Sequence, residues 1–502
     1  MLAEVVREAA ARYGATPAYV MPDGGTLSYA GLDRSSDEIA AGLYARGIRE
    51  GDVVALLLPS GPAYTVVYAA AAKLGAVTAG VNDRLSAPER RRCLAVARPR
   101  LVVASGRLAG DTDPGAEVVV VEEDMPDILR ELRVPGGNVP TLAPDTERPV
   151  AVVFTSGTTG DPKGAVFAGR QLDAISYIDG GGRWGGGGRG LSSTSFSHLG
   201  YMTKLPQVLR GGGTTFLMTR WSAAEALDMV QRHRVTVLGG IPTQVELMLR
   251  NERFASVDTS SVRLIAMGGG PATAPLVREA RVRFGVPVVV RYTCTEAGVG
   301  VGTAPDDPPE DAEETVGRAR DGVELTVRSE DDRLLPPGEI GHVCLRSAAV
   351  MSGYWHDPEA TAAVFTADGA VRTGDLGYLD ERGRLHLAGR TKEMYVRGGY
   401  NVFLLEVENV LADHPGVAHV AVASRTDPVM GEIGVAVIVP RQVDDPPTLE
   451  SLREHARARL ATYKLPEALV ITSELPRTAM EKIDRRALGA LVGAEPVSRP
   501  VR

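Results

Sequence analysis

The chain has 502 residues, more than one hydrophobic core usually supports, so we expect two or more domains. Its 55 Lys and Arg residues against 63 Asp and Glu residues give a net charge of −8, which argues against a nucleic-acid partner. No apolar run reaches the length of a transmembrane helix and the three cysteines lack metal or disulfide spacing, so we expect a cytoplasmic protein.

Residues 1–150 alternate between strand-like and helix-like segments. One helix is marked at both ends, by Pro62 in its first turn and by Gly75 just after its last residue. The expected elements are helices over 1–13, 31–46 and 62–74 and strands over 52–58, 101–104 and 117–121. This alternation predicts an α/β fold, with a mostly parallel sheet and helices on both faces.

The segment Phe154–Gly164 follows an apolar run, 150–154, that we expect to be a buried strand. Its glycines let a ligand approach the backbone, its N–H groups and hydroxyls can surround an anion, and Lys163 adds a positive charge. Pro162 stands where a Walker A loop has glycine, so we expect a polyphosphate-binding loop of another kind. The candidate phosphate ligands are Thr155, Ser156, Gly157, Thr158, Thr159, Gly160 and Lys163.

Residues 150–340 repeat the alternation of strands and helices. Ser222 is suited to cap a helix that runs to Arg234. Strands are expected over 235–238, 264–267 and 288–291. The last two of these strands run into the motifs Gly268–Pro271 and Tyr292–Glu296. Open α/β sheets bind ligands at such strand ends, and a carboxylate there can hold Mg²⁺ beside phosphate oxygens.

The last third of the chain changes character twice. Residues 322–355 suggest a small antiparallel sheet or barrel, and 370–391 complete the large body. After Arg390 we expect strands over 394–397, 417–424 and 434–440 and helices over 405–413 and 448–460. These elements form a small α+β domain, so the predicted division is a large domain over 1–391 and a small one over 392–502.

Several motifs, in order, resemble those of the adenylate-forming superfamily, which comprises acyl-CoA synthetases, firefly-type luciferases and the adenylation domains of peptide synthetases. The motifs are the phosphate loop 154–164, Tyr292–Glu296, Arg372–Gly377, Gly389–Lys392, Arg397–Asn401 and Pro476–Arg485. The likeness covers nearly the whole chain and is greatest to acyl-CoA synthetases. It implies a large body of stacked, mostly parallel sheets with helices and a small β-barrel-like part, followed by a small mobile C-terminal domain.

The resemblance also implies a role for individual residues. In the nucleotide site, Tyr292 would pack on adenine, Asp375 would bind the ribose, Arg390 would reach ribose or phosphate, and Thr295 would contact phosphate. Gly269, Gly270 and Pro271 would lie against adenine and substrate, and Thr155 and Glu296 would hold Mg²⁺. The residues implied at the acyl and CoA sites are His198, Gly200, Gly269, Thr293, Gly298, Gly398 and Gly399.

Lys482 matches the lysine of the C-terminal motif, where an ammonium would stabilise the charge that grows in the transition state. Together with Thr295 and Glu296 it forms the implied catalytic set. Lys392 would be the hinge between the domains. Two residues depart from the family pattern: Thr293 replaces a glycine beside the acyl pocket, and Glu481 replaces the glycine before Lys482.

The expected activity is an ATP-dependent carboxylate–CoA ligase that forms an acyl-adenylate and then an acyl-CoA thioester. Its cofactors and co-substrates would be ATP, Mg²⁺ and coenzyme A, and its substrate a small carboxylic acid. Three alternatives stay open: transfer to a carrier protein, activation of an unusual acid such as nitrite, and a nucleotide-binding regulator without activity. The oligomeric state is also open, with a homodimer among the possibilities.

Overall fold

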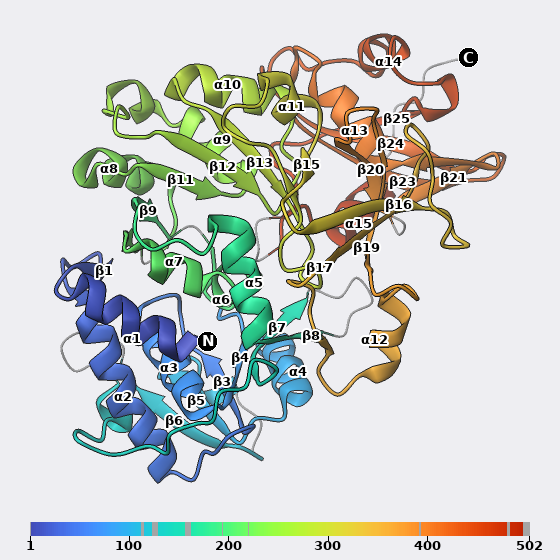
Figure 1. Cartoon of the computed structure of the whole chain (residues 1–502). Coiled ribbons are helices and arrows are strands. Elements are labelled where there is room, and N and C mark those ends of the chain that lie inside the picture. The colour runs from blue at the N-terminus through green and yellow to red at the C-terminus, as the bar shows by residue number, and fades with distance from the viewer. Residues whose placement is uncertain are drawn as a thin grey trace.

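The first large sheet occupies the lower, blue part of Figure 1 and has the strand order β18-β8-β7-β4-β3-β5-β6. The computed structural model describes residues 2–111, 115–122, 129–155, 162–192, 194–218, 220–390, 393–478 and 482–494. The strands of this sheet are β3 (Val53–Leu57), β4 (Val77–Gly80), β5 (Leu101–Ser105), β6 (Glu117–Val121), β7 (Pro149–Thr155), β8 (Lys163–Ala168) and β18 (Gly353–Tyr354). The strands from β7 to β6 are parallel, whereas β8 and β18 are antiparallel additions at one edge.

Helices cover both faces of this sheet, as the alternating pattern predicts. In β3, Val54 and Leu56 pack on the side of α3, while Val53 and Leu57 pack on the side of α4. The predicted helix over 62–74 is confirmed, and Gly75 follows it with a left-handed φ of 68°. The helices around this sheet are α1 (Leu2–Tyr13), α2 (Tyr29–Ala45), α3 (Pro62–Leu74) and α4 (Ala87–Ala97).

The second large sheet has the order β15-β14-β13-β12-β11-β9-β10-β1-β2, and its green strands β11, β12 and β13 lie in the upper part of Figure 1. Its strands are β1 (Pro17–Val20), β2 (Thr26–Ser28), β9 (Arg189–Leu191), β10 (Thr214–Phe216), β11 (Val237–Gly240), β12 (Leu264–Gly268), β13 (Val288–Tyr292), β14 (Val301–Gly302) and β15 (Arg318–Ala319). The helices α8 (Ala223–His233), α9 (Pro242–Arg250), α10 (Ala274–Phe284) and α11 (Pro309–Glu314) contribute to the core of this sheet. The helices α5 (Gly169–Gly180), α6 (Leu199–Met202) and α7 (Leu205–Gly211) contribute to the core that includes the first sheet.

One strand of the second sheet starts later than its sequence predicts. The expected cap is present, since Ser222 Oγ accepts a hydrogen bond from the Glu225 N–H at 3.2 Å. The strand predicted from Val235, however, begins at Val237, because the Val235 N–H donates back to the Val230 carbonyl of α8 at 3.2 Å. The end of the helix thus uses Val235, whereas the Thr236 N–H donates to the Arg189 carbonyl of β9 at 2.8 Å.

The third sheet is antiparallel, with the order β16-β17-β19-β20. It consists of β16 (Val323–Arg328), β17 (Gly341–Ser347), β19 (Val371–Leu379) and β20 (Leu385–Arg390), and α12 (Pro358–Val364) precedes β19. For this part we expected either a sheet or a barrel. The described residues form a four-stranded sheet. The strands β19 and β20, which fall within the predicted segment 370–391, belong to this sheet.

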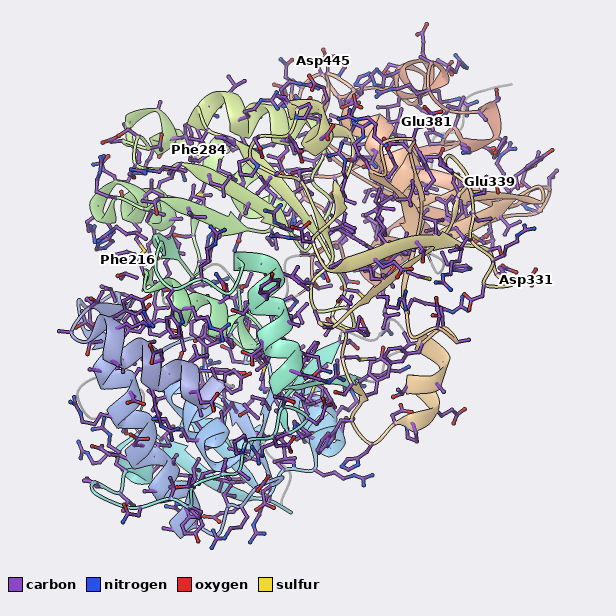
Figure 2. All side chains as sticks on the ribbon, in the orientation of Figure 1. Phe216, Phe284, Asp331, Glu339, Glu381 and Asp445 are labelled. Atoms are coloured by element: carbon purple, nitrogen blue, oxygen red, sulfur yellow. The ribbon has the colours of Figure 1, made fainter. Side chains whose placement is uncertain are left out.

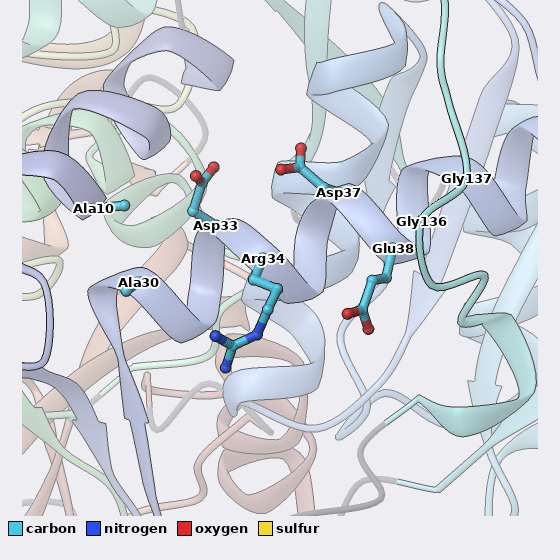
Figure 3. A pocket seen from close by; sticks show the side chains of 8 residues that line it. All are labelled: Ala10, Ala30, Asp33, Arg34, Asp37, Glu38, Gly136 and Gly137. Carbon is cyan, nitrogen blue, oxygen red and sulfur yellow. The ribbon is translucent and has the colours of Figure 1, made fainter.

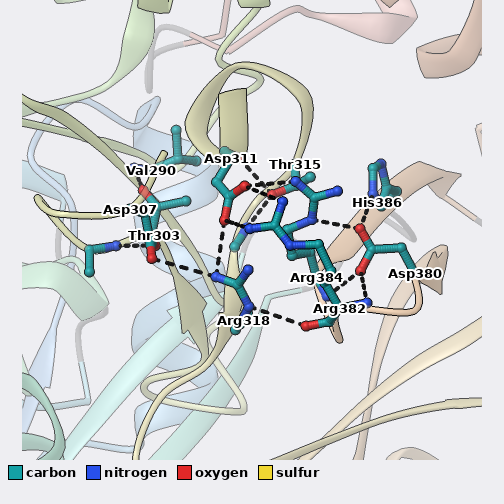
Figure 4. Close-up of polar contacts among 12 residues, drawn as sticks. Val290, Thr303, Asp307, Asp311, Thr315, Arg318, Asp380, Arg382, Arg384 and His386 are labelled. Carbon is teal, nitrogen blue, oxygen red and sulfur yellow. Dashed lines mark hydrogen bonds and ion pairs between the residues drawn. The ribbon is translucent and has the colours of Figure 1, made fainter. Parts of the chain in front are cut away.

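A buried carboxylate ties the third sheet to the edge of the second (Figure 4). The side chain of Asp311, on α11, is fully buried and accepts from three arginines. Arg384 lies 2.7 Å away, Arg318 3.0 Å and Arg382 3.4 Å. Because Arg318 belongs to β15 and the other two arginines lie in the turn before β20, this carboxylate links the two sheets.

The last part of the chain forms its own sheet, on the right in Figure 1, with the order β22-β21-β24-β23 and β25 paired to β24. Its elements are β21 (Met394–Arg397), β22 (Tyr400–Phe403), α13 (Leu404–Ala412), β23 (Val417–Asp427), β24 (Gly431–Pro440), α14 (Leu449–Arg457), β25 (Ala468–Ile471) and α15 (Arg485–Ala494). Every predicted element after Arg390 is present. The domain boundary itself stays a prediction, because Thr391 and Lys392 lie outside the described residues.

Figure 2 labels four acidic side chains and two phenylalanines that differ in exposure. Asp331, Glu339, Glu381 and Asp445 are exposed, whereas Phe216 and Phe284 are 2% and 7% exposed. Among the residues that the structure describes, no helix combines the length and apolarity that crossing a membrane would require.

Candidate functional site

The strands β11, β12 and β13 are parallel neighbours, so their carboxyl ends meet at one edge of the second sheet. The backbone there is open: Gly269, Gly270 and Pro271 are exposed after β12. A Cβ atom added at Gly269 or Gly270 would meet only Ile241 or Pro242, each at 3.6 Å, and Gly269 has a left-handed φ of 77°. A flat ligand can therefore approach this backbone closely.

A buried carboxylate lies beside this edge. Asp375, 7% exposed, accepts a hydrogen bond from the Tyr292 hydroxyl at 2.6 Å and one from Arg390 Nε at 2.9 Å. Asp375 and Arg390 are direct partners across β19 and β20, and Tyr292 ends β13. Burial and the charge of Asp375 raise the pKa of Tyr292 well above its ordinary value, so this hydroxyl stays a donor. A carboxylate has about four lone-pair positions, so Asp375 can accept further bonds from a diol.

The phosphate loop is held at both ends. Thr155, the last residue of β7, is directly opposite Lys163, the first residue of β8. The predicted ligands Ser156, Gly157, Thr158, Thr159 and Gly160 lie outside the described residues. The antiparallel pairing nevertheless brings the threonine and the lysine to the same place, as a loop that closes on an anion requires.

Glu296 is held from two directions. Its Oε1 accepts from the Tyr354 hydroxyl at 2.6 Å, and its carbonyl accepts from the Met351 N–H at 2.9 Å. Burial, and next the charge of Glu296, raise the pKa of the Cys294 thiol well above its ordinary value. Within the described ranges, no group of three or more His, Cys, Asp or Glu could hold a metal. A lone carboxylate beside phosphates is nevertheless what Mg²⁺ commonly uses, so these residues fit an ion that nucleotide oxygens help to bind.

Lys482 reaches this site from the far end of the chain. Its N–H donates to Thr478 Oγ1 at 3.3 Å, and its carbonyl accepts from the Thr478 N–H at 2.7 Å. Its side chain keeps an accessible surface, but desolvation and the charge of Arg390 lower the pKa of its ammonium, which Asp375 partly opposes. The cation thus lies near the same carboxylate that Tyr292 and Arg390 contact.

The C-terminal sheet and the segment before Lys482 both contact helix α9. Arg477 Nη1 donates to Thr243 Oγ1 at 2.9 Å, one residue after the Pro242 that borders Gly270. On the same helix, Glu246 Oε2 lies 3.3 Å from His419 Nδ1 of β23. These contacts connect the part of the chain that carries Lys482 to the open strand edge.

His198, one of the residues predicted at the acyl and CoA sites, lies near Lys482. Its Nδ1 caps α6 by accepting from the Gly200 N–H at 3.3 Å. Burial, and next the charge of Lys482, lower the pKa of His198 to about 4, so the imidazole is neutral at physiological pH. Gly200 is exposed, while the neighbouring Ser197 is buried.

A separate hollow of about 330 Å³ lies against α2 (Figure 3). Asp33, Asp37 and Glu38 line it, together with the turn Gly136–Gly137. Lys73 contacts Asp33 and Asp37, each at 2.6 Å. An acidic lining repels phosphate, so this hollow is a poor place for a nucleotide.

Two family models match the chain. The model of the AMP-binding enzyme family matches residues 6–355, and that of the AMP-binding enzyme C-terminal domain matches residues 406–482. The chain belongs to the AMP-binding enzyme family.

Relatives within this family match the chain over nearly its full length. The indoleacetate–CoA ligase of Aromatoleum aromaticum is 35% identical over 485 residues, which are 93% of this chain and 93% of the relative. The fatty acid–acyl-carrier-protein ligase ScoC of Streptomyces coeruleorubidus is 32% identical and covers 94% of this chain and 93% of its own. The solved structure of ATP-bound MatB from Rhodopseudomonas palustris has a TM-score of 0.88 at 27% identity, covering 98% of this chain and 99% of that one.

Some residues implied by the family likeness lie elsewhere or outside the described residues. The turn Gly398–Gly399 forms the tip of the β21–β22 hairpin, at the right-hand margin of Figure 1, and Gly398 donates to the Met430 carbonyl at 2.8 Å. Gly298 is packed against Ala349, whose carbonyl oxygen would be 2.5 Å from an added Cβ atom, so close packing alone requires glycine there. Lys392 and Glu481 lie outside the described residues.

The roles of Thr293 and Thr295 also stay predictions for this AMP-binding enzyme. Thr293 Oγ1 donates to the Cys294 carbonyl at 3.1 Å, and the Thr295 carbonyl accepts from the Gly298 N–H at 3.3 Å. These contacts fix the chain between β13 and β14, which positions Glu296.

Two contacts of this AMP-binding enzyme were missed at the sequence level: Tyr354 on Glu296, and Arg477 on Thr243. A two-residue strand such as Gly353–Tyr354 has no periodicity that would reveal it. Arg477 belongs to a recognised motif, but its partner is 234 residues away in the sequence.

The neutral state of His198 predicts a pH-dependent stability. The pKa of His198 is about 4 in the folded chain, below its ordinary value of 6.5. As the pH falls below 6.5, the unfolded chain therefore binds a proton at this imidazole before the folded chain does. Relative to His198→Gln, the wild type should therefore lose roughly 1–2 kcal/mol of unfolding free energy between pH 7.5 and pH 5. Denaturant unfolding of both proteins at the two pH values measures this, and a difference that is the same at both pH values would contradict it.

Proposed function

We propose that this chain is an ATP-dependent carboxylate–CoA ligase, which forms an acyl-adenylate with release of pyrophosphate and then an acyl-CoA thioester. The observation that supports this most directly is the hydrogen bond from Arg477, in the segment before Lys482, to Thr243 on α9 beside the open strand edge. A cation from the C-terminal segment thereby reaches the strand edge of the large body. The relatives named as CoA ligases support the same reaction class.

In the proposed first step, a substrate carboxylate oxygen attacks the α-phosphorus of ATP, and pyrophosphate leaves. Such a step needs placement and charge neutralisation more than a covalent residue. Tyr292 stacks on the adenine, Asp375 accepts the ribose hydroxyls, and Lys482 stabilises the charge on the α-phosphate. When bound at Glu296 and Thr155, Mg²⁺ would neutralise phosphate charge.

The phosphate end of the nucleotide has its own residues in this proposal. Thr155 and Lys163 are already opposite each other, and the loop between them supplies the remaining donors. Arg390 donates a hydrogen bond from its Nε to Asp375. Its side chain is exposed, and the rest of the guanidinium reaches toward ribose or phosphate.

In the proposed second step, the thiol of coenzyme A attacks the acyl carbon and AMP leaves. The C-terminal domain rotates about Lys392 between the steps. Lys482 then leaves the nucleotide site, and the Gly398–Gly399 turn moves to the site of coenzyme A. The position of this turn at the margin of the molecule is consistent with an arrangement set for the first step. A cytoplasmic location belongs to the same proposal.

Transfer to a carrier protein is the second candidate. It is favoured by one relative, ScoC, which is named as a fatty acid–acyl-carrier-protein ligase. The two candidates share the first step and differ only in the thiol that takes the acyl group.

The test is pyrophosphate exchange into ATP with a panel of aryl, indolyl and aliphatic acids. At least one acid should support exchange, and adding coenzyme A should convert that acid to its thioester. Conversion only after a phosphopantetheinylated carrier protein is added would favour the second candidate. Binding of ATP without exchange for any acid would contradict both.

A further inference from the structure

We propose that Tyr354 is a positioning residue for both Glu296 and Lys163. Its one side chain supports the carboxylate that would bind the metal and the lysine of the phosphate loop. The inference rests on the proposed binding of ATP and Mg²⁺. The side chain of Tyr354 contacts Glu296 and Lys163. It acts through the two residues that it holds.

The ring of Tyr354 supports the lysine. Tyr354 on β18 is the direct partner of Ala165 on β8, and Lys163 lies two residues earlier, so both partners face the same side of the sheet. The Lys163 ammonium lies 5.1 Å from the centroid of the Tyr354 ring, within the range of a cation–π contact. Since Lys163 is also opposite Thr155, the ring supports the lysine at the point where the two ends of the phosphate loop pair.

The hydroxyl of Tyr354 supports the carboxylate. It donates to Glu296 Oε1 at 2.6 Å, from 58 residues away in the sequence. The segment before it reinforces the link, because the Met351 N–H donates to the Glu296 carbonyl and the Ala349 carbonyl packs against Gly298. Residues 349–354 therefore run along residues 296–298 and fix the direction of the carboxylate.

A support of this kind matters because outer hydrogen bonds orient metal ligands and can change metal affinity 10-fold or more. One hydrogen bond occupies one lone pair of Glu296 and leaves the other carboxylate positions able to accept a metal. The ring and the hydroxyl have separate tasks, so two substitutions can separate them. Tyr354→Phe removes only the hydroxyl, and Tyr354→Leu removes both.

The experiment is calorimetric titration of the full chain with ATP, once with Mg²⁺ and once with EDTA. In Tyr354→Phe, the gain in ATP affinity that Mg²⁺ provides should fall by roughly 10-fold, while the affinity in EDTA stays at the wild-type value. In Tyr354→Leu, the affinity in EDTA should fall as well, because Lys163 loses its support. The Mg²⁺ concentration that gives half-maximal pyrophosphate exchange should rise in parallel for Tyr354→Phe.

A matched control is Tyr29→Phe, which removes another hydroxyl that donates one hydrogen bond, to the Gly213 carbonyl at 2.8 Å, at a place away from the loop. It should leave the effect of Mg²⁺ unchanged. A double-mutant cycle then separates positioning from general destabilisation. If Tyr354 acts through Glu296, Tyr354→Phe has no further effect on Mg²⁺ dependence in a Glu296→Gln background.

The inference is overturned if Tyr354→Phe keeps the wild-type effect of Mg²⁺, or if its effect is equally large in the Glu296→Gln background. It is also overturned if the wild type binds ATP equally well with and without Mg²⁺. Because calorimetry needs no acid substrate, an enzyme that binds Mg²⁺-ATP but fails to exchange pyrophosphate would contradict the proposed function while still deciding the role of Tyr354.

Discussion

Replacing Lys482 with alanine should lower pyrophosphate exchange by about 10²–10³-fold, the usual cost of removing a preorganised charge from a transition state. The reason is its position: its ammonium lies near Asp375 and Arg390, beside the open strand edge. Thiolysis of a supplied acyl-adenylate should stay near the wild-type rate. Radioactive pyrophosphate exchange and thioester formation measure the two half-reactions separately.

A matched control for this substitution is Lys464→Ala, which removes another lysine of the C-terminal part of the chain, one that pairs with Glu406 at 2.6 Å. It should leave both half-reactions nearly unchanged. If Lys482→Ala slows exchange and thiolysis equally, the assignment of this lysine to the first step is wrong.

Replacing Asp311 with alanine should lower the unfolding free energy of the large body by about 3–5 kcal/mol, as expected when one partner of a buried ion pair is removed. Its carboxylate is fully buried and faces Arg318, Arg382 and Arg384 (Figure 4). Without it, the arginines repel one another across the junction of two sheets. The shift of the denaturant transition, followed by tryptophan fluorescence and by circular dichroism, measures the effect.

The control is Asp331→Ala, which removes an exposed carboxylate at the edge of the third sheet (Figure 2). Its effect should stay within about 0.5 kcal/mol, as for most surface substitutions. A loss of similar size for both variants would mean that the buried network contributes no more than a surface charge.

The parts of the fold that the sequence predicts well have strong local signals. Helix α3 has Pro62 and Gly75 at its ends, and β12 and β13 are apolar runs that lead into glycine-rich or polar motifs. The start of β11 is wrong by two residues, because an apolar run does not reveal where the preceding helix ends. The short strand β18 has no signal of its own and depends on pairing with β8.

The candidate site divides in the same way. Asp375, Arg390 and Tyr292 are found through motifs that resemble a known family, but their hydrogen bonds depend on the register of β19 with β20 and on the approach of β13. The contact of Tyr354 with Glu296 depends on tertiary packing alone. Local patterns therefore identify the groups that carry chemistry more readily than the groups that hold them in place.

The bond between Arg477 and Thr243 has a consequence for the timing of a catalytic cycle. Arg477 forms an antiparallel β-bridge with Ile483, the neighbour of Lys482. We call this pairing of Arg477 with the residues next to Lys482 the clip. If the C-terminal domain turns as proposed, the clip moves as a unit, and release of the arginine from α9 withdraws the ammonium in the same motion. The departure of Lys482 would then be coupled to the breaking of the Arg477–Thr243 hydrogen bond, which is formed by residues outside the proposed substrate site.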